Sequence, residues 1–148
     1  MSMDKKQEIQ NALTAAMKAR DEDTKRTLRL VMSTIKLAEV EEGGTVDDSR
    51  VLSLLQKEVK TREDAIEEAR QANREDLIET ANREIAILNE FLPKQMSEDE
   101  LKQLAQDVVE ETAAASMRDM GKVMQQLMPR LEGRASGQEA SKVVRELL

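Results

Sequence analysis

Apolar residues recur at helical spacing along almost the whole chain, and short polar or glycine-containing breaks separate the repeats. Between Asp4 and Arg20 the apolar residues fall at i, i+3, i+4, i+7 and i+8, which places them on one stripe of a helix. A second stripe follows an acidic break at residues 21–23 and ends at Gly43 and Gly44. Glycine ends helices readily because it adopts the left-handed conformation. The pattern predicts two amphipathic helices.

The next two apolar stripes predict a long antiparallel helical hairpin. The first follows Asp47, which we expect to cap its helix, and the second belongs to a helix that we expect to start at Asn73, with Asp76 three residues on. Apolar positions in both stripes alternate spacings of three and four, a pattern typical of two helices that pack along one seam. Arg62 falls within this seam, and we expect its guanidinium to extend outward to solvent. Pro93 ends the second helix.

After this proline the sequence restarts as three short helices, each with its own start signal. Ser97, Ser116 and Ser136 each precede an acidic residue by three positions, which is the spacing of a capping box. We expect Pro129 and Gly133 to end the middle helix, because proline cannot continue a helix and glycine suits the left-handed turn that follows one. The pattern predicts a small three-helix unit.

The composition supports an all-α fold. Phe91 is the only aromatic residue, whereas β-sheets depend on aromatic and β-branched side chains. We therefore predict an N-terminal helical domain at residues 1–93, which contains the hairpin, and a C-terminal three-helix domain at residues 94–148. A core of fewer than roughly 70 residues is marginal by itself, so we expect the second domain to rely on the hairpin or on a partner.

The missing residue types narrow the classes of function. The chain has no Cys and no His, which excludes thiol chemistry and removes the commonest general base and nitrogen metal ligand. No glycine-rich phosphate loop, acidic calcium loop or serine elbow is present. We expect no metal, no cofactor and no independent catalysis, although a lysine nucleophile stays open. No apolar run reaches the roughly 20 residues of a membrane span, and a cytoplasmic location is the default expectation.

Positive charge gathers near the C-terminus of an otherwise acidic chain. The net charge is −7, yet residues 112–148 contain six Lys or Arg against four Asp or Glu. This distribution argues against general coating of nucleic acid and favours a local contact with phosphate. The candidate residues for binding tRNA or another anion are Arg118, Lys122, Arg130, Arg134, Ser136 and Gly137.

The loop between the last two predicted helices is the focus of this hypothesis. Gly133 suits a left-handed turn, and Ser136 caps a helix whose free N–H groups and positive dipole end favour an anion. Arg134 lies two residues before that cap. A plain helix turn with solvated basic residues explains the same pattern, so the two interpretations stay open.

Methionines cover one arc of the preceding helix, from Met117 to Met128. They fit core packing by a flexible side chain, and they also fit an adaptable groove for a partner protein. Gly121 interrupts this helix at a cost of about 1 kcal/mol relative to alanine. We therefore expect another helix to pack closely against Gly121.

Several motifs together resemble the YqeY family over essentially the whole chain. Residues 119–124, Pro129 and residues 133–137 are similar to its C-terminal signature. Residues 91–97 resemble its inter-domain junction, and residues 16–21 and 28–36 resemble its N-terminal helices. Ser136 stands where the family usually has Asp, and because both residues cap helices well, we expect the turn to survive.

The resemblance implies an all-helical fold in two parts. It also implies kinship between the C-terminal unit and the tail of the B subunit of the glutamyl/aspartyl-tRNA amidotransferase, a tail that contacts tRNA. On this basis Lys122, Arg130 and Arg134 are candidates for contact with the tRNA backbone. Family members are often labelled as amidotransferases or carbon–nitrogen ligases with glutamine as the amido donor, but the amidase and kinase active sites belong to other domains.

We therefore predict a non-catalytic accessory module that binds tRNA, or a protein complex linked to tRNA, through the C-terminal domain. The alternative is a protein-interaction module that uses the Met-rich helix at residues 117–128. An amidotransferase-related activity is the third interpretation. We expect no membrane partner.

Overall fold

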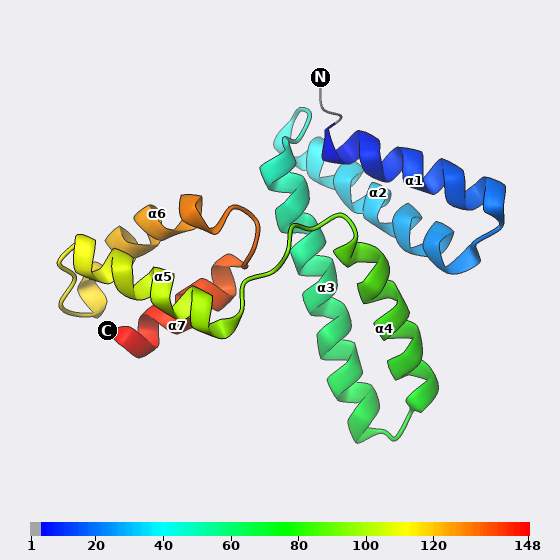
Figure 1. Ribbon diagram of the computed structural model, residues 1–148. Helices are drawn as coiled ribbons and strands as arrows, with labels where there is room; N and C mark the ends of the chain where they lie inside the picture. The colour runs from blue at the N-terminus through cyan, green and yellow to red at the C-terminus, as the bar shows by residue number, and fades with distance from the viewer. Residues whose placement is uncertain (1–3) are drawn as a thin grey trace. The chain divides into compact units, whose positions relative to one another are not determined.

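The computed structural model describes residues 4–148, which form helices joined by short turns and loops (Figure 1). The helices are α1 (Lys5–Ala19), α2 (Glu22–Glu42), α3 (Asp48–Gln71), α4 (Glu75–Asn89), α5 (Glu98–Glu111), the short 3₁₀ helix η1 (Met117–Asp119), α6 (Met120–Leu131) and α7 (Gly137–Leu147). Over the described residues there is no strand, so the prediction of an all-α fold is confirmed. The chain divides into two compact units, of which the first ends at Leu92 and the second covers Pro93–Leu148.

In the first unit, α1 packs against α2 and α3 packs against α4, each pair joined by a tight turn (Figure 1). The side chains of Asp4, Asp21 and Asp47 cap α1, α2 and α3 by accepting backbone hydrogen bonds at 2.7, 3.2 and 2.9 Å, respectively. Each carboxylate satisfies a free N–H group and places negative charge at the positive end of its helix. The predicted cap at Asp47 is confirmed.

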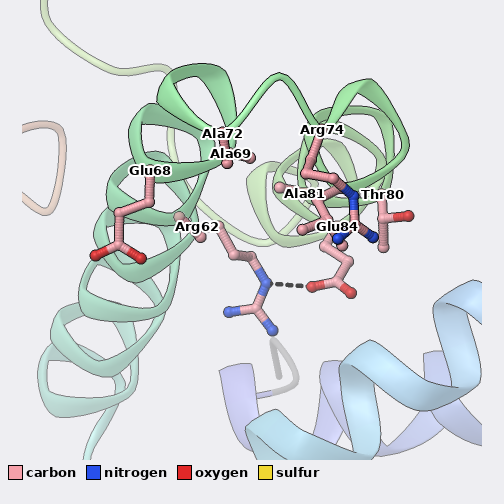
Figure 2. A pocket seen from close by; sticks show the side chains of 10 residues that line it. Arg62, Glu68, Ala69, Ala72, Arg74, Thr80, Ala81 and Glu84 are labelled. Carbon is pink, nitrogen blue, oxygen red and sulfur yellow. Dashed lines mark hydrogen bonds and ion pairs between the residues drawn. The ribbon is translucent and has the colours of Figure 1, made fainter.

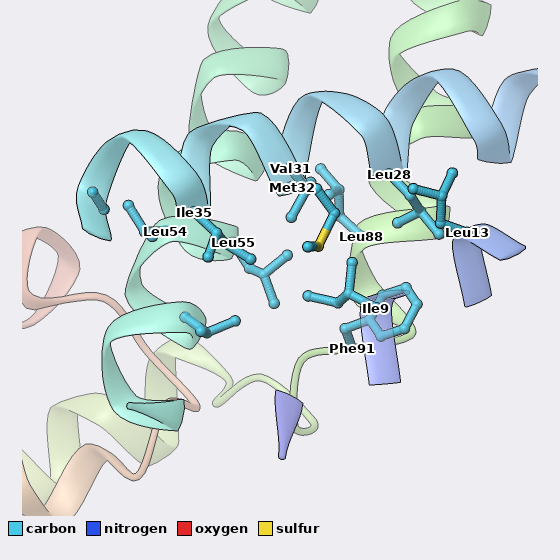
Figure 3. Packing of buried hydrophobic residues seen from close by; sticks show 12 residues of the cluster. Ile9, Leu13, Leu28, Val31, Met32, Ile35, Leu54, Leu55, Leu88 and Phe91 are labelled. Carbon is cyan, nitrogen blue, oxygen red and sulfur yellow. The ribbon is translucent and has the colours of Figure 1, made fainter. Parts of the chain in front are cut away.

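One hydrophobic cluster joins the four helices of the first unit, as Figure 3 shows. Phe91, the only aromatic residue, is 8% exposed and packs in this cluster just after α4. Burying a large aliphatic or aromatic side chain contributes roughly 1.5–3 kcal/mol. The members of this cluster with no exposed surface are Ile9, Leu28, Ile35, Leu55 and Leu88.

The predicted start of α4 is wrong. Asn73 does not cap this helix but adopts a left-handed φ of 56° in the turn after α3. The N-cap is Arg74, whose side chain forms no capping hydrogen bond. Asparagine suits both a cap and a left-handed turn, which explains why the local sequence did not separate the two.

The expectation that Arg62 extends to solvent is also wrong. Arg62 is only 8% exposed, and its Nε donates to Glu84 Oε2 at 2.7 Å (Figure 2). Its Nη1 donates to Glu58 Oε2 at 2.8 Å and to the Glu58 carbonyl at 3.0 Å. Burial alone would lower the pKa of Arg62, but hydrogen bonds and charge from the two glutamates outweigh burial and raise that pKa. A buried charge with two partners replaces the expected exposed one.

The second unit packs α5, α6 and α7 around an aliphatic cluster that contains no aromatic residue. Ser97 and Ser136 cap α5 and α7 by accepting hydrogen bonds from Glu100 N–H and Glu139 N–H, each at 3.1 Å. Ser116 and Asp119 form a reciprocal capping box at η1. The members of the cluster with no exposed surface are Ala105, Val108, Val123, Leu127, Ala140 and Val144.

Pro129 and Gly133 were predicted to end α6, and the structure agrees with this prediction only at Gly133. Pro129 lies inside the helix, which continues to Leu131. Glu132 and Gly133 then adopt left-handed φ values of 50° and 75°. The predicted left-handed Gly133 is therefore confirmed, whereas Pro129 does not end the helix.

Candidate nucleic-acid interface

The six predicted binding residues all lie in the second unit, from η1 to the first residue of α7. They differ in whether other groups of the protein already occupy their polar atoms. The polar side chains of Arg130, Arg134 and Ser136 bind other groups of the protein. Arg118 and Lys122 are exposed without an ion pair among the described residues, and Gly137 contributes no polar side chain.

Arg130 forms an ion pair with Glu111, which is the last residue of α5. The hydrogen bond from Arg130 lowers the pKa of Glu111, and the bond to Glu111 raises the pKa of Arg130. Both side chains are well exposed, and exposed pairs of this kind contribute little to stability. The guanidinium of Arg130 is therefore partly neutralised but accessible to a competing anion.

Arg134 ties the α6–α7 loop to the segment that follows Pro93. Its Nε donates to the Lys94 carbonyl at 2.9 Å, and its Nη2 donates to Glu100 Oε2 at 2.8 Å. Its own carbonyl accepts a hydrogen bond from Met96 N–H at 2.8 Å. These contacts engage both the side chain and the backbone of Arg134, and they give this residue a structural role that its position in the sequence did not indicate.

The start of α7 is occupied by protein groups. Ser136 Oγ accepts from Glu139 N–H and also donates to Glu139 Oε1 at 3.2 Å. The carboxylate of Glu139 thus lies at the helix N-terminus, where it repels an incoming anion. A Cβ added at Gly137 would lie 3.1 Å from Met128 Cε and 3.3 Å from its Sδ, so a larger residue here requires the Met128 side chain to shift. The arrangement disfavours an anion at this helix end.

Arg118 in η1 and Lys122 in the first turn of α6 lie four residues apart, and both are exposed. Among residues 4–148 neither forms an ion pair or a side-chain hydrogen bond. Hydrogen bonds from Ala115 N–H and Ser116 N–H lower the pKa of nearby Asp119, and the charge of Lys122 contributes to this shift. Both backbone hydrogen bonds reach Asp119 Oδ2, and among the described residues Lys122 forms no ion pair with this carboxylate.

The exposed face of α6 continues beyond these two cations. Gln125 and Gln126 are exposed, and at about 100° per residue they follow Lys122 on the same side of the helix. We call Arg118, Lys122, Gln125 and Gln126 the α6 polar strip. Amide and cationic groups are the side chains that contact phosphate and sugar oxygens in nucleic-acid complexes. The strip therefore has suitable chemistry for a polyanion backbone.

The expected close approach of a helix to Gly121 is wrong. This glycine is exposed, and a Cβ added to it would meet no atom within 4 Å among the described residues. Its φ is not left-handed, so backbone conformation does not require glycine either. Glycine costs a helix about 1 kcal/mol relative to alanine. Within the described chain, neither packing nor backbone conformation explains why a glycine occupies this position.

The methionine arc of α6 is partly core and partly surface. Met120 and Met124 pack against the hydrophobic cluster of the second unit. Met117 and Met128, at the two ends of the arc, are 50% and 44% exposed. Core packing therefore explains Met120 and Met124. Only Met117 and Met128 are exposed enough to contact a partner protein.

A pocket of about 410 Å³ lies between α3 and α4 in the first unit (Figure 2). Some of its polar side chains bind other groups of the protein: Arg62 pairs with Glu84, and Arg74 Nη2 donates to Asp76 Oδ2 at 3.0 Å. Within residues 4–148, no cluster of three or more acidic residues has a geometry that could hold a metal ion. No helix in the described part of the chain has the length and apolar character to span a bilayer.

Comparison with known proteins gives matches over most of the chain. The family profile described as Yqey-like protein matches residues 6–148. An uncharacterized protein of Schizosaccharomyces pombe is 37% identical over 89 residues, which are 60% of this chain and 72% of that protein. Altered inheritance of mitochondria protein 41, mitochondrial, of Pyrenophora tritici-repentis is 30% identical over 144 residues, which are 95% of this chain and 78% of that protein. Because this name refers to mitochondria, the cytoplasmic location stays a prediction.

Proposed function

Because the chain belongs to the YqeY-like family, whose profile covers residues 6–148, we propose that it is a non-catalytic helical accessory module. Its ligand is tRNA, or a protein complex that carries tRNA, and the second unit makes the contact. The same unit carries the motifs that resemble the tRNA-contacting tail of the amidotransferase B subunit. The proposal narrows the contact to the α6 polar strip.

The observation that carries the proposal is the contrast between two kinds of cation among the predicted binding residues. Arg118 and Lys122 are exposed and have no ion pair among residues 4–148, so a phosphate reaches them without displacing a carboxylate. Arg130 and Arg134 are paired with Glu111 and Glu100. Each phosphate that a free cation neutralises releases counterions from the nucleic acid, and this release drives binding.

The paired arginines have secondary roles in this proposal. Arg130 is on the same helix, and its exposed pair with Glu111 is weak enough for a phosphate to replace the carboxylate. Arg134 supports the site indirectly, since it fixes the loop that follows α6 through Lys94 and Glu100.

A salt-dependent binding assay tests the proposal. Fluorescence anisotropy with labelled tRNA, measured over a range of salt concentrations, gives the affinity and its salt slope. The double variant Arg118→Ala/Lys122→Ala is expected to bind more weakly, and the slope is expected to fall by about 1 for each phosphate that the variant no longer neutralises.

The matched control is Lys142→Ala/Arg145→Ala, which removes the same charge from exposed positions of α7. This control is expected to keep most of the affinity. Equal loss in both double variants would reduce the effect to general electrostatics, and no loss in either would contradict the proposed site.

A protein partner on the Met-rich helix is the alternative, and the exposure of Met117 and Met128 favours it. Ribonuclease treatment distinguishes the two proposed functions, because it removes RNA-dependent contacts and leaves direct protein contacts. Co-purification that survives ribonuclease and is lost in a Met117→Asp/Met128→Asp variant supports the protein partner. Both methionines are well exposed, so the variant is expected to fold.

A further inference from the structure

The helix α2 has a second apolar stripe that faces away from the core. Leu30, Leu37 and Val40 are 51%, 59% and 78% exposed, and no other described helix exposes as many large aliphatic side chains. With the exposed Ser33 they recur at spacings of three, four and three. This is the repeat of a coiled-coil seam. The inner face of α2 supplies different residues, such as Leu28 and Ile35, to the core.

Charged residues flank this outer stripe in a definite order. In heptad terms Leu30 and Leu37 occupy a positions, and Ser33 and Val40 occupy d positions. The g positions that precede the leucines are then Arg29 and Lys36, and the e positions that follow the d residues are Thr34 and Glu41. One edge of the stripe is therefore basic and the other edge is polar or acidic.

The charges at these edges are available for a partner. The side chains of Arg29 and Glu41 form no hydrogen bond or ion pair with any residue that the structure describes. Lys36 contributes to the lowered pKa of Glu39, but the hydrogen bond from Lys6 is the main cause of that shift. Thr34 donates a hydrogen bond to Glu58 Oε1 at 3.4 Å, which places a carboxylate beside the second edge.

We propose that this α2 outer stripe is the interface of a weak parallel dimer of the chain. In a parallel pair, the g residue of one helix faces the e residue five positions later on the other helix. Lys36 then faces Glu41 of the second copy, and the two-fold symmetry makes this pair twice. Arg29 faces Thr34 and its neighbouring carboxylate, Glu58. Both basic positions thus meet acidic or acceptor groups.

The same charges disfavour the antiparallel arrangement. With Leu30 set against Val40 of the second copy, the basic edges of both helices would lie on one side of the seam. The two Lys36 ammonium groups would then approach each other close to the symmetry axis, and like charges that face each other are destabilising. Charge complementarity therefore selects the parallel arrangement.

The short stripe predicts modest affinity. It spans only two heptads, and Ser33 replaces an aliphatic side chain in one of the four layers. Interfaces below about 1,200 Å² are typical of weak and transient complexes. The dimer is expected to form in a concentration-dependent manner, and since the stripe lies in the first unit, it does not depend on the proposed contact with tRNA.

Sedimentation velocity of the full chain, from about 1 µM to about 1 mM, covers the range expected for such affinities. The average mass is expected to rise from that of a monomer toward that of a dimer. Leu37→Lys is expected to remain monomeric throughout, because it places a charge in the seam. The matched control is Leu77→Lys on α4, since Leu77 is 48% exposed and lies outside the stripe. Circular dichroism verifies that both variants are folded.

Charge reversal tests the register. Lys36→Glu and Glu41→Lys are each expected to weaken dimerisation roughly two- to ten-fold through the two symmetric pairs. The double variant Lys36→Glu/Glu41→Lys restores the pairs and is expected to recover the affinity. A monomer at every concentration overturns the proposal, as does a dimer that tolerates Leu37→Lys or a double variant that fails to recover.

Discussion

Arg134 Nε donates a hydrogen bond to the backbone carbonyl of Lys94 at 2.9 Å, across 40 positions of sequence. The same guanidinium binds Glu100, and the Arg134 carbonyl accepts a hydrogen bond from Met96 N–H. One residue thus holds the beginning of the second unit against the loop between α6 and α7. This arrangement makes Arg134 a structural residue first.

Arg134→Ala is expected to destabilise the second unit by about 1–2 kcal/mol, since the carbonyl of Lys94 and the carboxylate of Glu100 lose a donor. Lysine is not expected to rescue the loss, because it lacks the planar fork of donors. Chemical denaturation followed by circular dichroism measures the change. Arg130→Ala, which breaks an exposed pair, is the control and is expected to change stability little. Equal stability of the two variants would argue against the structural role.

Arg62→Ala is expected to destabilise the first unit by about 2–3 kcal/mol, because Glu58 and Glu84 lose the cation that holds them in the seam. Thermal denaturation of this variant is compared with that of Arg70→Ala, which removes an exposed pair with Glu67 in the last turn of α3. The control is expected to stay close to the parent protein. If Arg62→Ala melts at the temperature of the control, the buried network does not stabilise the hairpin.

Gly121→Ala is expected to stabilise the protein by up to about 1 kcal/mol, because alanine favours the helix and its Cβ meets no atom within 4 Å. The urea midpoint is therefore expected to rise. Gly137→Ala is the contrasting variant, since its Cβ would lie 3.1 Å from Met128 Cε. A lower midpoint for Gly121→Ala would show an unrecognised constraint on this turn. A gain in stability together with weaker tRNA binding would indicate that the ligand approaches the backbone there.

Acid is expected to weaken the protein through carboxylates with lowered pKa values, and Asp119 is the clearest case. Hydrogen bonds from Ala115 N–H and Ser116 N–H lower its folded pKa. The stabilisation from this group is complete above its unfolded pKa of about 3.9 and is lost as the pH falls through the lower folded value. Urea midpoints measured between about pH 2.5 and pH 7 are expected to fall less steeply for Asp119→Asn. An unchanged slope would mean that the pKa of Asp119 is the same in the folded and unfolded states.

Incubation of the purified chain with mischarged tRNA, glutamine and ATP is expected to give no amidated product. The chain has no Cys and no His, and Arg62 and Glu84 of the α3–α4 pocket are paired with each other. Mass spectrometry of the released amino acid measures the outcome. Turnover that persists after repeated purification would contradict the proposal of a non-catalytic module.

Local sequence signals predicted the helices well and the long-range contacts poorly. The caps at Asp47 and Ser97 were predictable because a cap and its N–H donor lie within three residues. The partners of Arg134 lie 34 and 40 residues away, and no local pattern indicates them. Glu58 lies four residues before Arg62, so this partner was visible in the sequence, whereas Glu84 depended on the register of the hairpin.

The two glycines of the second unit that were given functional or packing roles show the same limit. Sequence position alone suggested that a helix packs on Gly121 and that Gly137 contacts an anion. The structure shows open space at the first and the side chain of Met128 at the second. What surrounds a glycine depends on tertiary packing, and the local sequence does not contain that information.

The single aromatic ring of the chain has a practical consequence for spectroscopy. With no Trp or Tyr, the protein has almost no intrinsic fluorescence, so dye-free emission cannot follow its unfolding. Biosynthetic incorporation of fluorophenylalanine would instead give one ¹⁹F resonance, because Phe91 is the only site that takes the label. Because Phe91 is buried in the cluster of the first unit, this resonance reports selectively on unfolding of that unit. Circular dichroism follows the loss of helix in both units, so comparison of the two melting curves gives the unfolding of the aliphatic second unit.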